Sequence, residues 1–232
     1  MVDDKSLGES KSNCIEKLEQ ECATLNANLN IFDNSVPLKM AIFVTKESAP
    51  LHDLLIKHQA GELSCEIPFI VSNHHHLEPI ADQFKIPYFH LPVSVNTRID
   101  QEEKIMELLI SEKIDLMVLA RYMQILSPRL IEKFTAINIH HGFLPAFKGK
   151  RPYHQAWEKG VKIIGATAHY VTEDLDEGPI ITQDVASVTH HHTVKDMIRA
   201  GRDIERRVLT TAVKAHLEHR IILHKKRTII FH

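Results

Sequence analysis

Asn138 and His140 stand two residues apart at the end of a short apolar run, A-I-N-I-H-H-G, just before glycine and proline interrupt the pattern. In an extended chain, residues two apart point to the same side, so the amide and the imidazole share one wall while Ile139 and His141 face the other way. An amide N–H can stabilise an oxyanion, and an imidazole moves protons near neutral pH. This pair is therefore our candidate catalytic centre, and we expect His141 to be a core histidine.

A second apolar stretch, A-T-A-H-Y-V-T-E-D-L-D-E-G-P-I-I over residues 166–181, ends in a polar turn that carries Asp174 and Asp176. If both stretches form strands of one parallel sheet, their carboxyl ends would bring Asp176 toward His140. The carboxylate would then orient an attacking water, accept its proton and steer the imidazole. Asp174 is predicted to contact the substrate, although an acidic turn is also typical of a solvated loop.

Other side chains in these stretches could shape the crevice. Thr167 and His169 lie two residues apart, so both could point inward and position water. Phe143 and the Leu144-Pro145 turn could form a wall of the pocket. We therefore predict substrate contacts for Phe143, Thr167 and His169.

Three longer motifs surround these residues: L-A-R-Y-M-Q-I-L-S, H-H-G-F-L-P-A-F-K-G-K-R-P-Y-H-Q-A and G-V-K-I-I-G-A-T-A-H-Y-V. Together they resemble the formyltransferase-type fold that handles 10-formyltetrahydrofolate and, within it, the formyltetrahydrofolate deformylase family, from about Leu38 to the C-terminus. The resemblance implies hydrolysis of 10-formyltetrahydrofolate to formate and tetrahydrofolate, which supplies formate for purine biosynthesis and balances the one-carbon folate pools. It assigns oxyanion stabilisation to Asn138 and His140, water activation to Asp176, and no cofactor beyond the folate substrate.

The same resemblance gives a binding role to the segment that follows L-A-R. In the related family the backbone there hydrogen-bonds the pterin ring, which places this role on Gln124, Ile125 and Leu126. Sequence alone would make these residues a loop leading into a helix. One departure is Gly142, where the family usually has a serine, and we expect it to affect the rate and not the reaction type.

Two other functions compete with hydrolysis. Phosphoribosylglycinamide formyltransferase must also grip a substrate phosphate, commonly with a glycine-rich loop after the first strand, but here the loop reads T-K-E-S-A-P and Glu47 would repel the anion. A non-catalytic folate-binding module is the alternative of another class, and the complete set of Asn138, His140 and Asp176 argues against it. Methionyl-tRNA formyltransferase would need a further RNA-binding domain.

Strand and helix patterns alternate from Pro37 onward. Apolar runs such as L-K-M-A-I-F-V and I-D-L-M-V-L-A are typical of buried parallel strands, and helical periods cover residues 51–59, 77–84, 99–111 and 194–216. We predict an α/β fold of the Rossmann-like, doubly wound type, with a mostly parallel sheet, helices on both faces and a C-terminal strand pair. The stretches V-K-I-I-G-A-T-A-H-Y and G-P-I-I-T-Q-D-V are expected to pair as an antiparallel edge of the sheet.

We predict a catalytic domain over residues 37–232 and a separate N-terminal segment over residues 1–36. Deformylases of the resembling family usually carry an ACT-type regulatory domain, and this segment could be a remnant of it, too short to form the βαββαβ unit. A helical stripe between Ile15 and Leu25 is expected to pack on the main domain or on a partner subunit.

Composition argues against several classes of function. Of the 232 residues, 44% are hydrophobic and 25% charged, and the net charge of -2 gives no basic field that would draw nucleic acid. The start of the chain is acidic and no apolar run approaches about 20 residues, so we expect a cytoplasmic protein without membrane contact. Separately, we expect the protein to be a homo-oligomer. The His74-His75-His76 and His190-His191-His192 triplets suggest a metal, but adjacent residues converge poorly on one ion, so none is expected.

Overall fold

The chain divides into two compact units, residues 1–36 and residues 37–232. The computed structural model describes residues 10–94, 96–146 and 151–231. In the first unit the described helix is α1 (Lys11–Thr24), which begins where the Ser10 hydroxyl accepts a hydrogen bond from the Asn13 amide. Serine favours this position because it satisfies a free N–H of the first turn. The origin of this unit in an ACT-type domain stays a prediction.

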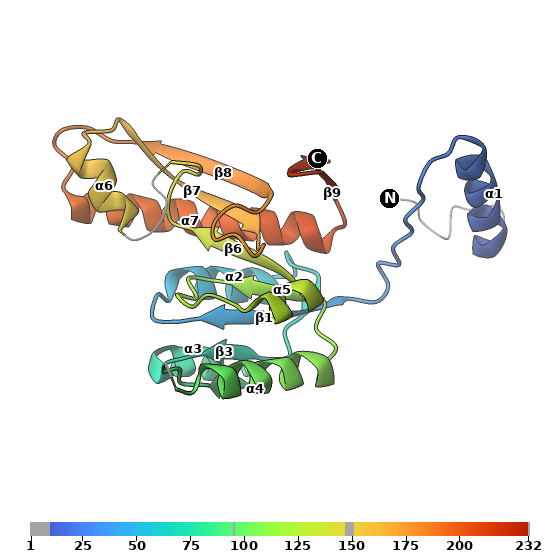
Figure 1. Cartoon of the computed structure of the whole chain (residues 1–232), viewed down its shortest axis with the longest axis horizontal. Coiled ribbons are helices and arrows are strands. Elements are labelled where there is room, and N and C mark those ends of the chain that lie inside the picture. Colours follow the sequence, from blue (N-terminus) through green and yellow to red (C-terminus); the bar gives the residue numbers. More distant parts are fainter. Residues whose placement is uncertain (1–9, 95, 147–150, 232) are drawn as a thin grey trace. The chain divides into compact units, whose positions relative to one another are not determined.

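The second unit is built on a mixed sheet with the strand order β4-β3-β1-β5-β6-β7-β8, and β2 pairs with β1 (Figure 1). The strands β1 to β6 pair in parallel, whereas β7 and β8 run antiparallel to their neighbours. The predicted α/β fold with a mostly parallel sheet is confirmed. The strands are β1 Leu38–Val44, β2 Cys65–Glu66, β3 Ile70–Ser72, β4 Tyr88–His90, β5 Leu116–Leu119, β6 Thr135–His140, β7 Ile163–Tyr170 and β8 Ile180–Ser187.

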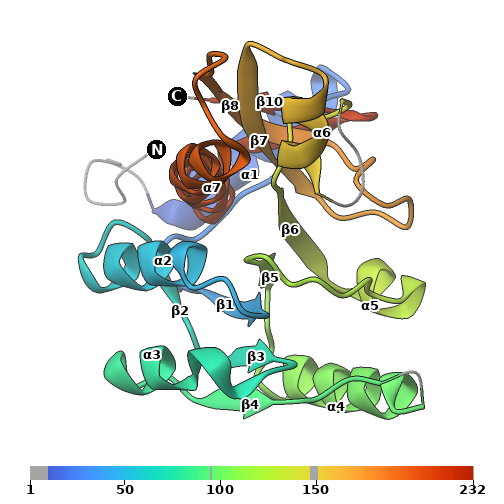
Figure 2. The ribbon, with the colours of Figure 1, turned by 90° about the vertical axis from the view of Figure 1, so that its left-hand side faces the viewer.

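Helices cover both faces of this sheet, as predicted. Seen nearly end-on to the sheet, α2, α3 and α7 lie on one side and α4 and α5 on the other (Figure 2). The predicted helices agree with the observed ones to within a few residues. The described helices are α2 Ala49–Gln59, the 3-10 turn η2 His75–Leu77, α3 Glu78–Gln83, α4 Arg98–Ser111, α5 Pro128–Lys133, α6 Pro152–Glu158 and α7 Val194–Leu217.

Strand β1 shows why helices are needed on both sides. Met40, Ile42 and Val44 belong to the core cluster that includes α2 and α7, whereas Ala41 and Phe43 belong to the cluster that includes α4. All five are 0% exposed. Because side chains alternate along a strand, a continuous apolar run fits a strand that is covered on both faces.

The pairing of β6 with β7 corrects one expectation. We predicted that the two site-bearing stretches lie in one parallel sheet, but β6 and β7 are antiparallel, with His140 opposite Thr167 and Asn138 opposite His169. Residues 141–162 connect the two strands, which is enough chain for a connection of either direction. The length of the connection therefore does not set the strand direction. In the structure the chain enters β7 from the end at which β6 stops.

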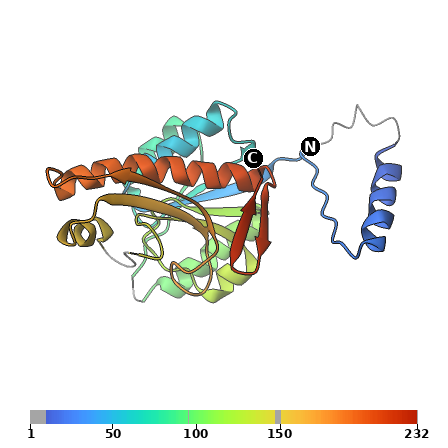
Figure 3. The same ribbon diagram turned by 90° about the horizontal axis from the view of Figure 1, so that it is seen from above.

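Helix α7 packs against β6, β7 and β8 and leads to the end of the chain. It starts with a capping box, in which the Thr193 hydroxyl accepts from the Asp196 amide and the Asp196 carboxylate accepts from the Thr193 amide. The predicted C-terminal strand pair follows as the antiparallel hairpin β9 (Ile221–His224) and β10 (Arg227–Ile230), beside the end of α7 (Figure 3). Among the described residues, no helix is long and apolar enough to cross a membrane.

Candidate active site

The site begins at the end of β6, where side chains alternate between the hydrophobic core and the face that carries the candidate catalytic groups. Ile137 and Ile139 point into the core cluster that includes α7, so Asn138 and His140 point to the opposite face. His140 is 4% exposed. Strand β6 pairs in parallel with β5. His140 is therefore at the carboxyl ends of the parallel strands, where such sheets bind ligands.

Asp176 brings a carboxylate to this face of the sheet. Its Oδ2 atom lies 3.2 Å from Nδ1 of His140, and its Oδ1 atom lies 3.7 Å from Nε2 of His169. All three side chains are at most one-tenth exposed. The expected approach of Asp176 to His140 is therefore present, although the strands that carry them are not parallel.

The loop between β7 and β8 reaches His140 by folding back over the end of β7. Asp176 has a φ of 57°, in the left-handed region that few residues other than glycine adopt. Gly178 is needed for the close packing of this loop, because a Cβ at that position would lie 1.7 Å from the carbonyl oxygen of Tyr170. Such backbone constraint is commonly found where a functional side chain must be held in one place.

His169 links the amide and the carboxylate. Its Nδ1 lies 2.8 Å from the carbonyl oxygen of Tyr170, so this nitrogen carries a proton and donates it. In the neutral ring Nε2 is then an acceptor, and the side-chain nitrogen of Asn138 lies 3.3 Å from it. His169 thereby fixes which way the Asn138 amide turns, a positioning role that we did not anticipate for it.

The charge states of the site follow from its surroundings. Burial alone would raise the pKa of Asp176, but the contacts of its carboxylate with the His140 and His169 rings outweigh burial and hold that pKa well below its usual range. Burial lowers the pKa of His141 to about 3, helped by the positive charges of Arg121 and His140. Asp176 is thus a carboxylate and His141 a neutral ring at neutral pH.

Thr167 holds the loop that follows β6. Its hydroxyl donates to the Gly142 carbonyl at 2.9 Å, and it accepts from the Leu144 amide at 3.1 Å and from Gln183 Nε2 at 2.9 Å. Gln183 also donates to the Leu144 carbonyl at 2.8 Å. Sequence reasoning missed Gln183, because only the β7–β8 register places it opposite Thr167. A contact of Thr167 with water stays a prediction.

The other predicted substrate contacts lie around this centre. Gln124, Ile125 and Leu126 follow β5, the neighbour of β6, and Leu126 is buried while Ile125 is exposed. Phe143 is half-buried, with its ring beside Gly165 of β7. Asp174 is exposed in the loop that carries Asp176. Substrate contacts at these positions stay predictions.

The loop after β1 does not offer a free carboxylate. Glu47 pairs with Arg202 of α7, at 3.0 Å between Oε2 and Nη2. We expected Glu47 to repel a phosphate, but the ion pair partly neutralises its charge. The stronger obstacle to phosphate binding is therefore the lack of glycine in T-K-E-S-A-P, since a phosphate loop exposes its backbone N–H groups.

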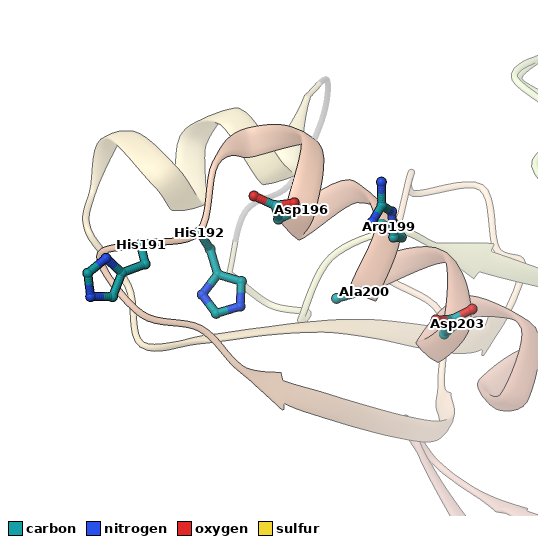
Figure 4. A pocket seen from close by; sticks show the side chains of 6 residues that line it. All are labelled: His191, His192, Asp196, Arg199, Ala200 and Asp203. Carbon is teal, nitrogen blue, oxygen red and sulfur yellow. The ribbon is translucent and has the colours of Figure 1, made fainter.

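A separate hollow of about 500 Å³ opens at the start of α7 (Figure 4). Two of its side chains stabilise local backbone. His192 Nδ1 accepts a hydrogen bond from the Thr189 amide, and the Asp196 carboxylate accepts one from the Thr193 amide in the helix cap. No group of three or more His, Cys, Asp or Glu side chains in the described parts of the chain could hold a metal ion. The hollow is lined by His191, His192, Asp196, Arg199, Ala200 and Asp203.

The sequence profile of the formyl transferase family matches residues 38–213. A formyltetrahydrofolate deformylase from Synechocystis sp. is 52% identical over 201 residues, which cover 86% of this chain and 70% of that protein. The chain belongs to the formyltetrahydrofolate deformylase family. This confirms the resemblance and, at the level of the family, the predicted class of enzyme. The chain spans 63% of the length of the deformylase from Mycobacterium tuberculosis, which is 50% identical.

Solved structures agree with this family. The deformylase from Pseudomonas syringae pv. tomato is 40% identical, with a TM-score of 0.92 over 98% of this chain and 77% of that one. Glycinamide ribonucleotide transformylase 1 from Symbiobacterium toebii is 27% identical, with a TM-score of 0.80 over 88% of this chain and 98% of that one. The deformylase family thus shares its fold with transferases, from which this chain is more distant.

Proposed function

We propose that the protein hydrolyses 10-formyltetrahydrofolate to formate and tetrahydrofolate. The observation that carries this proposal is the contact between Asp176 and His140, with Asn138 on the same buried face. An amide donor, an imidazole and a carboxylate around one point are the groups that hydrolysis of an amide-like formyl group requires. In the cell this reaction would supply formate for purine biosynthesis and balance the one-carbon folate pools.

Asn138 and His140 stabilise the charge that develops on the formyl oxygen. When water attacks the formyl carbon, the C=O double bond becomes a C–O⁻ single bond, and donors aimed at that oxygen lower the barrier by about 3 kcal/mol each. The contact with His169 holds the Asn138 amide with its nitrogen toward the site. Such fixed donors need no reorganisation during the reaction.

Asp176 orients the water. Its lowered pKa keeps it ionised, so it accepts a hydrogen bond from water throughout the neutral range. A carboxylate of low pKa is a weak base. It therefore receives the water proton as the O–C bond forms and not before the attack.

Collapse of the tetrahedral intermediate completes the reaction. The C–N10 bond breaks, its electron pair stays on N10, and that nitrogen takes a proton. One proton of the water thus ends on tetrahydrofolate, and the water oxygen ends in formic acid, which releases the second proton to solvent and becomes formate. His140 is the group between Asp176 and the substrate that can carry this proton.

The runner-up function is formyl transfer to glycinamide ribonucleotide. The transferase-like fold of the relatives permits it, but the loop after β1 has no glycine to expose phosphate-binding N–H groups. The higher identity to deformylases, 52% against 27% for the Symbiobacterium transformylase, also favours water as acceptor. Folate binding without turnover is the third possibility, and it would leave the buried carboxylate without a role.

A formate-release assay tests the proposal. Purified protein is incubated with 10-formyltetrahydrofolate, with and without glycinamide ribonucleotide, and both formate and formylated product are measured. We expect stoichiometric formate and tetrahydrofolate without the amine. Turnover only in the presence of the amine would show that the protein is a transferase. Binding of folate without any turnover would show that it is a binding module.

A further inference from the structure

The loop that follows β5, residues 122–127, is fastened to the first turns of α4 by two charged side chains. Nη2 of Arg98 donates to the carbonyl oxygen of Ile125 at 2.7 Å. The amide of Ser127 donates to Oε1 of Glu102 at 3.1 Å. Hydrogen bonds to charged groups are stronger than those between neutral groups, so the helix holds the second half of the loop at both a carbonyl and an amide.

The first half of the loop is held by neutral groups. Gln101, which is 6% exposed, donates from Nε2 to the Leu91 carbonyl at 2.7 Å and to the Tyr122 hydroxyl at 3.3 Å. The Met123 amide donates to the hydroxyl of Thr45 at 3.1 Å. The loop is therefore fixed along its length, and the α4 residues that fix it lie three and four positions apart, on one helix face.

These contacts leave a defined set of backbone groups open. The N–H and C=O groups of Gln124 and Leu126, and the N–H of Ile125, make no hydrogen bond with another described residue. Donors and acceptors alternate along such a backbone edge, which suits the amide-like edge of a pterin ring. The carbonyl of Ile125 is excluded from this set because Arg98 occupies it.

We propose that Arg98 and Glu102 are positioning residues that hold the loop in the shape in which its open backbone edge binds the pterin. This inference rests on the proposed function, which makes a folate the substrate, and on the predicted contact of the loop with the pterin ring. The two side chains also lie 3.9 Å apart, between Nε and Oε1, so each orients the other. Their side chains are 50% and 18% exposed, so replacing them leaves the core intact.

The test compares four methionine variants of the full chain. Arg98→Met and Glu102→Met remove the two contacts. Glu103→Met and Lys104→Met are matched controls on the same helix, exposed and without a hydrogen bond or ion pair to another described residue. We measure kcat and KM for 10-formyltetrahydrofolate, the Kd of tetrahydrofolate, and the Tm of each variant.

Each contact variant should raise KM and Kd about tenfold with kcat changed less than about threefold, because the loop binds the pterin and does not touch the formyl group. The two controls should match the wild type. Arg98→Lys and Glu102→Gln, which keep a donor and an acceptor, should recover most of the affinity. A lower Tm with an unchanged Kd in the contact variants, or equal loss in the controls, would overturn the positioning role.

The outcome separates this inference from the proposed function. A wild-type protein that binds tetrahydrofolate but releases no formate would overturn the hydrolysis alone, because the Kd values of the variants would still decide the role of Arg98 and Glu102. A wild-type protein that releases formate, with contact variants of unchanged Kd, would overturn the inference alone. A wild-type protein that binds no folate would overturn both.

Discussion

The carboxylate of Asp176 lies 3.2 Å from Nδ1 of His140, although one belongs to the loop after β7 and the other to the end of β6. Both side chains are at most one-tenth exposed. Charged groups are costly to bury, so a carboxylate held beside an imidazole at this end of the sheet indicates chemistry more than stability.

Asp176→Asn should remove most turnover and leave folate binding largely intact. The amide keeps the size of the side chain but loses the charge that orients water, so we expect kcat to fall by about 100-fold or more. Glu173→Gln is the matched control, because Glu173 is an exposed acid in the same loop and has no predicted role in the site. Near-normal formate release from Asp176→Asn would remove Asp176 from the mechanism.

His169→Phe should lower kcat about tenfold or more with little change in KM. The substitution keeps an aromatic ring of similar size but removes the acceptor that orients the Asn138 amide, and one oxyanion donor contributes a factor of about 100 or more. Steady-state kinetics of formate release separate the two parameters. A rise in KM alone would mean that His169 contacts the substrate and does not position Asn138.

Gly178→Ala should displace the loop that carries Asp176. The new Cβ would lie 1.7 Å from the Tyr170 carbonyl oxygen, so the backbone must move and the Asp176 contact is lost. Gly160→Ala is a suitable control, since a Cβ at that position would meet no atom within 4 Å. We expect loss of formate release with a retained circular-dichroism spectrum in the first variant, and activity near wild type in the second.

Two half-buried histidines, His141 and His216, should make the protein less stable in mild acid. Burial lowers the pKa of His141 to about 3 and that of His216 to about 4. Below about pH 6.5 the unfolded chain takes up a proton on each ring while the folded chain does not, so stability is lost as the pH falls from about 6.5 toward those values. Asp176 does not contribute to this fall, because the stability from its lowered pKa is present above the ordinary pKa of a carboxyl and is lost only at lower pH.

Urea unfolding at pH 7 and pH 5 measures this effect. Each histidine should account for about 1 to 2 kcal/mol of the fall in the free energy of unfolding. His216→Asn should reduce the pH-dependent fall in the free energy of unfolding by the contribution of one histidine. His224→Asn, at an exposed position of the C-terminal hairpin, should not change that fall. An equal fall in wild type and His216→Asn would show that His216 is not the source.

Much of the fold is present in local sequence patterns. The continuous apolar run of β1 and the long helical period of α7 are local features of the sequence, so they predict these elements without knowledge of their neighbours. The alternation of side chains along a strand placed Asn138 and His140 on one face. The capping pair Thr193 and Asp196 likewise marks the start of α7 locally.

Only the tertiary structure determined which elements pack against each other and in which direction the strands run. Nothing in the local pattern of residues 166–181 shows that β7 runs antiparallel to β6, because strand direction depends on the path of the intervening chain. The link from His169 to Asn138 follows from the β6–β7 register, and the bridge by Gln183 follows from the β7–β8 register. The sequence by itself determined which chemical groups the site has, whereas their distances and orientations arose only from long-range packing, since residues far apart in the chain supply the contacts.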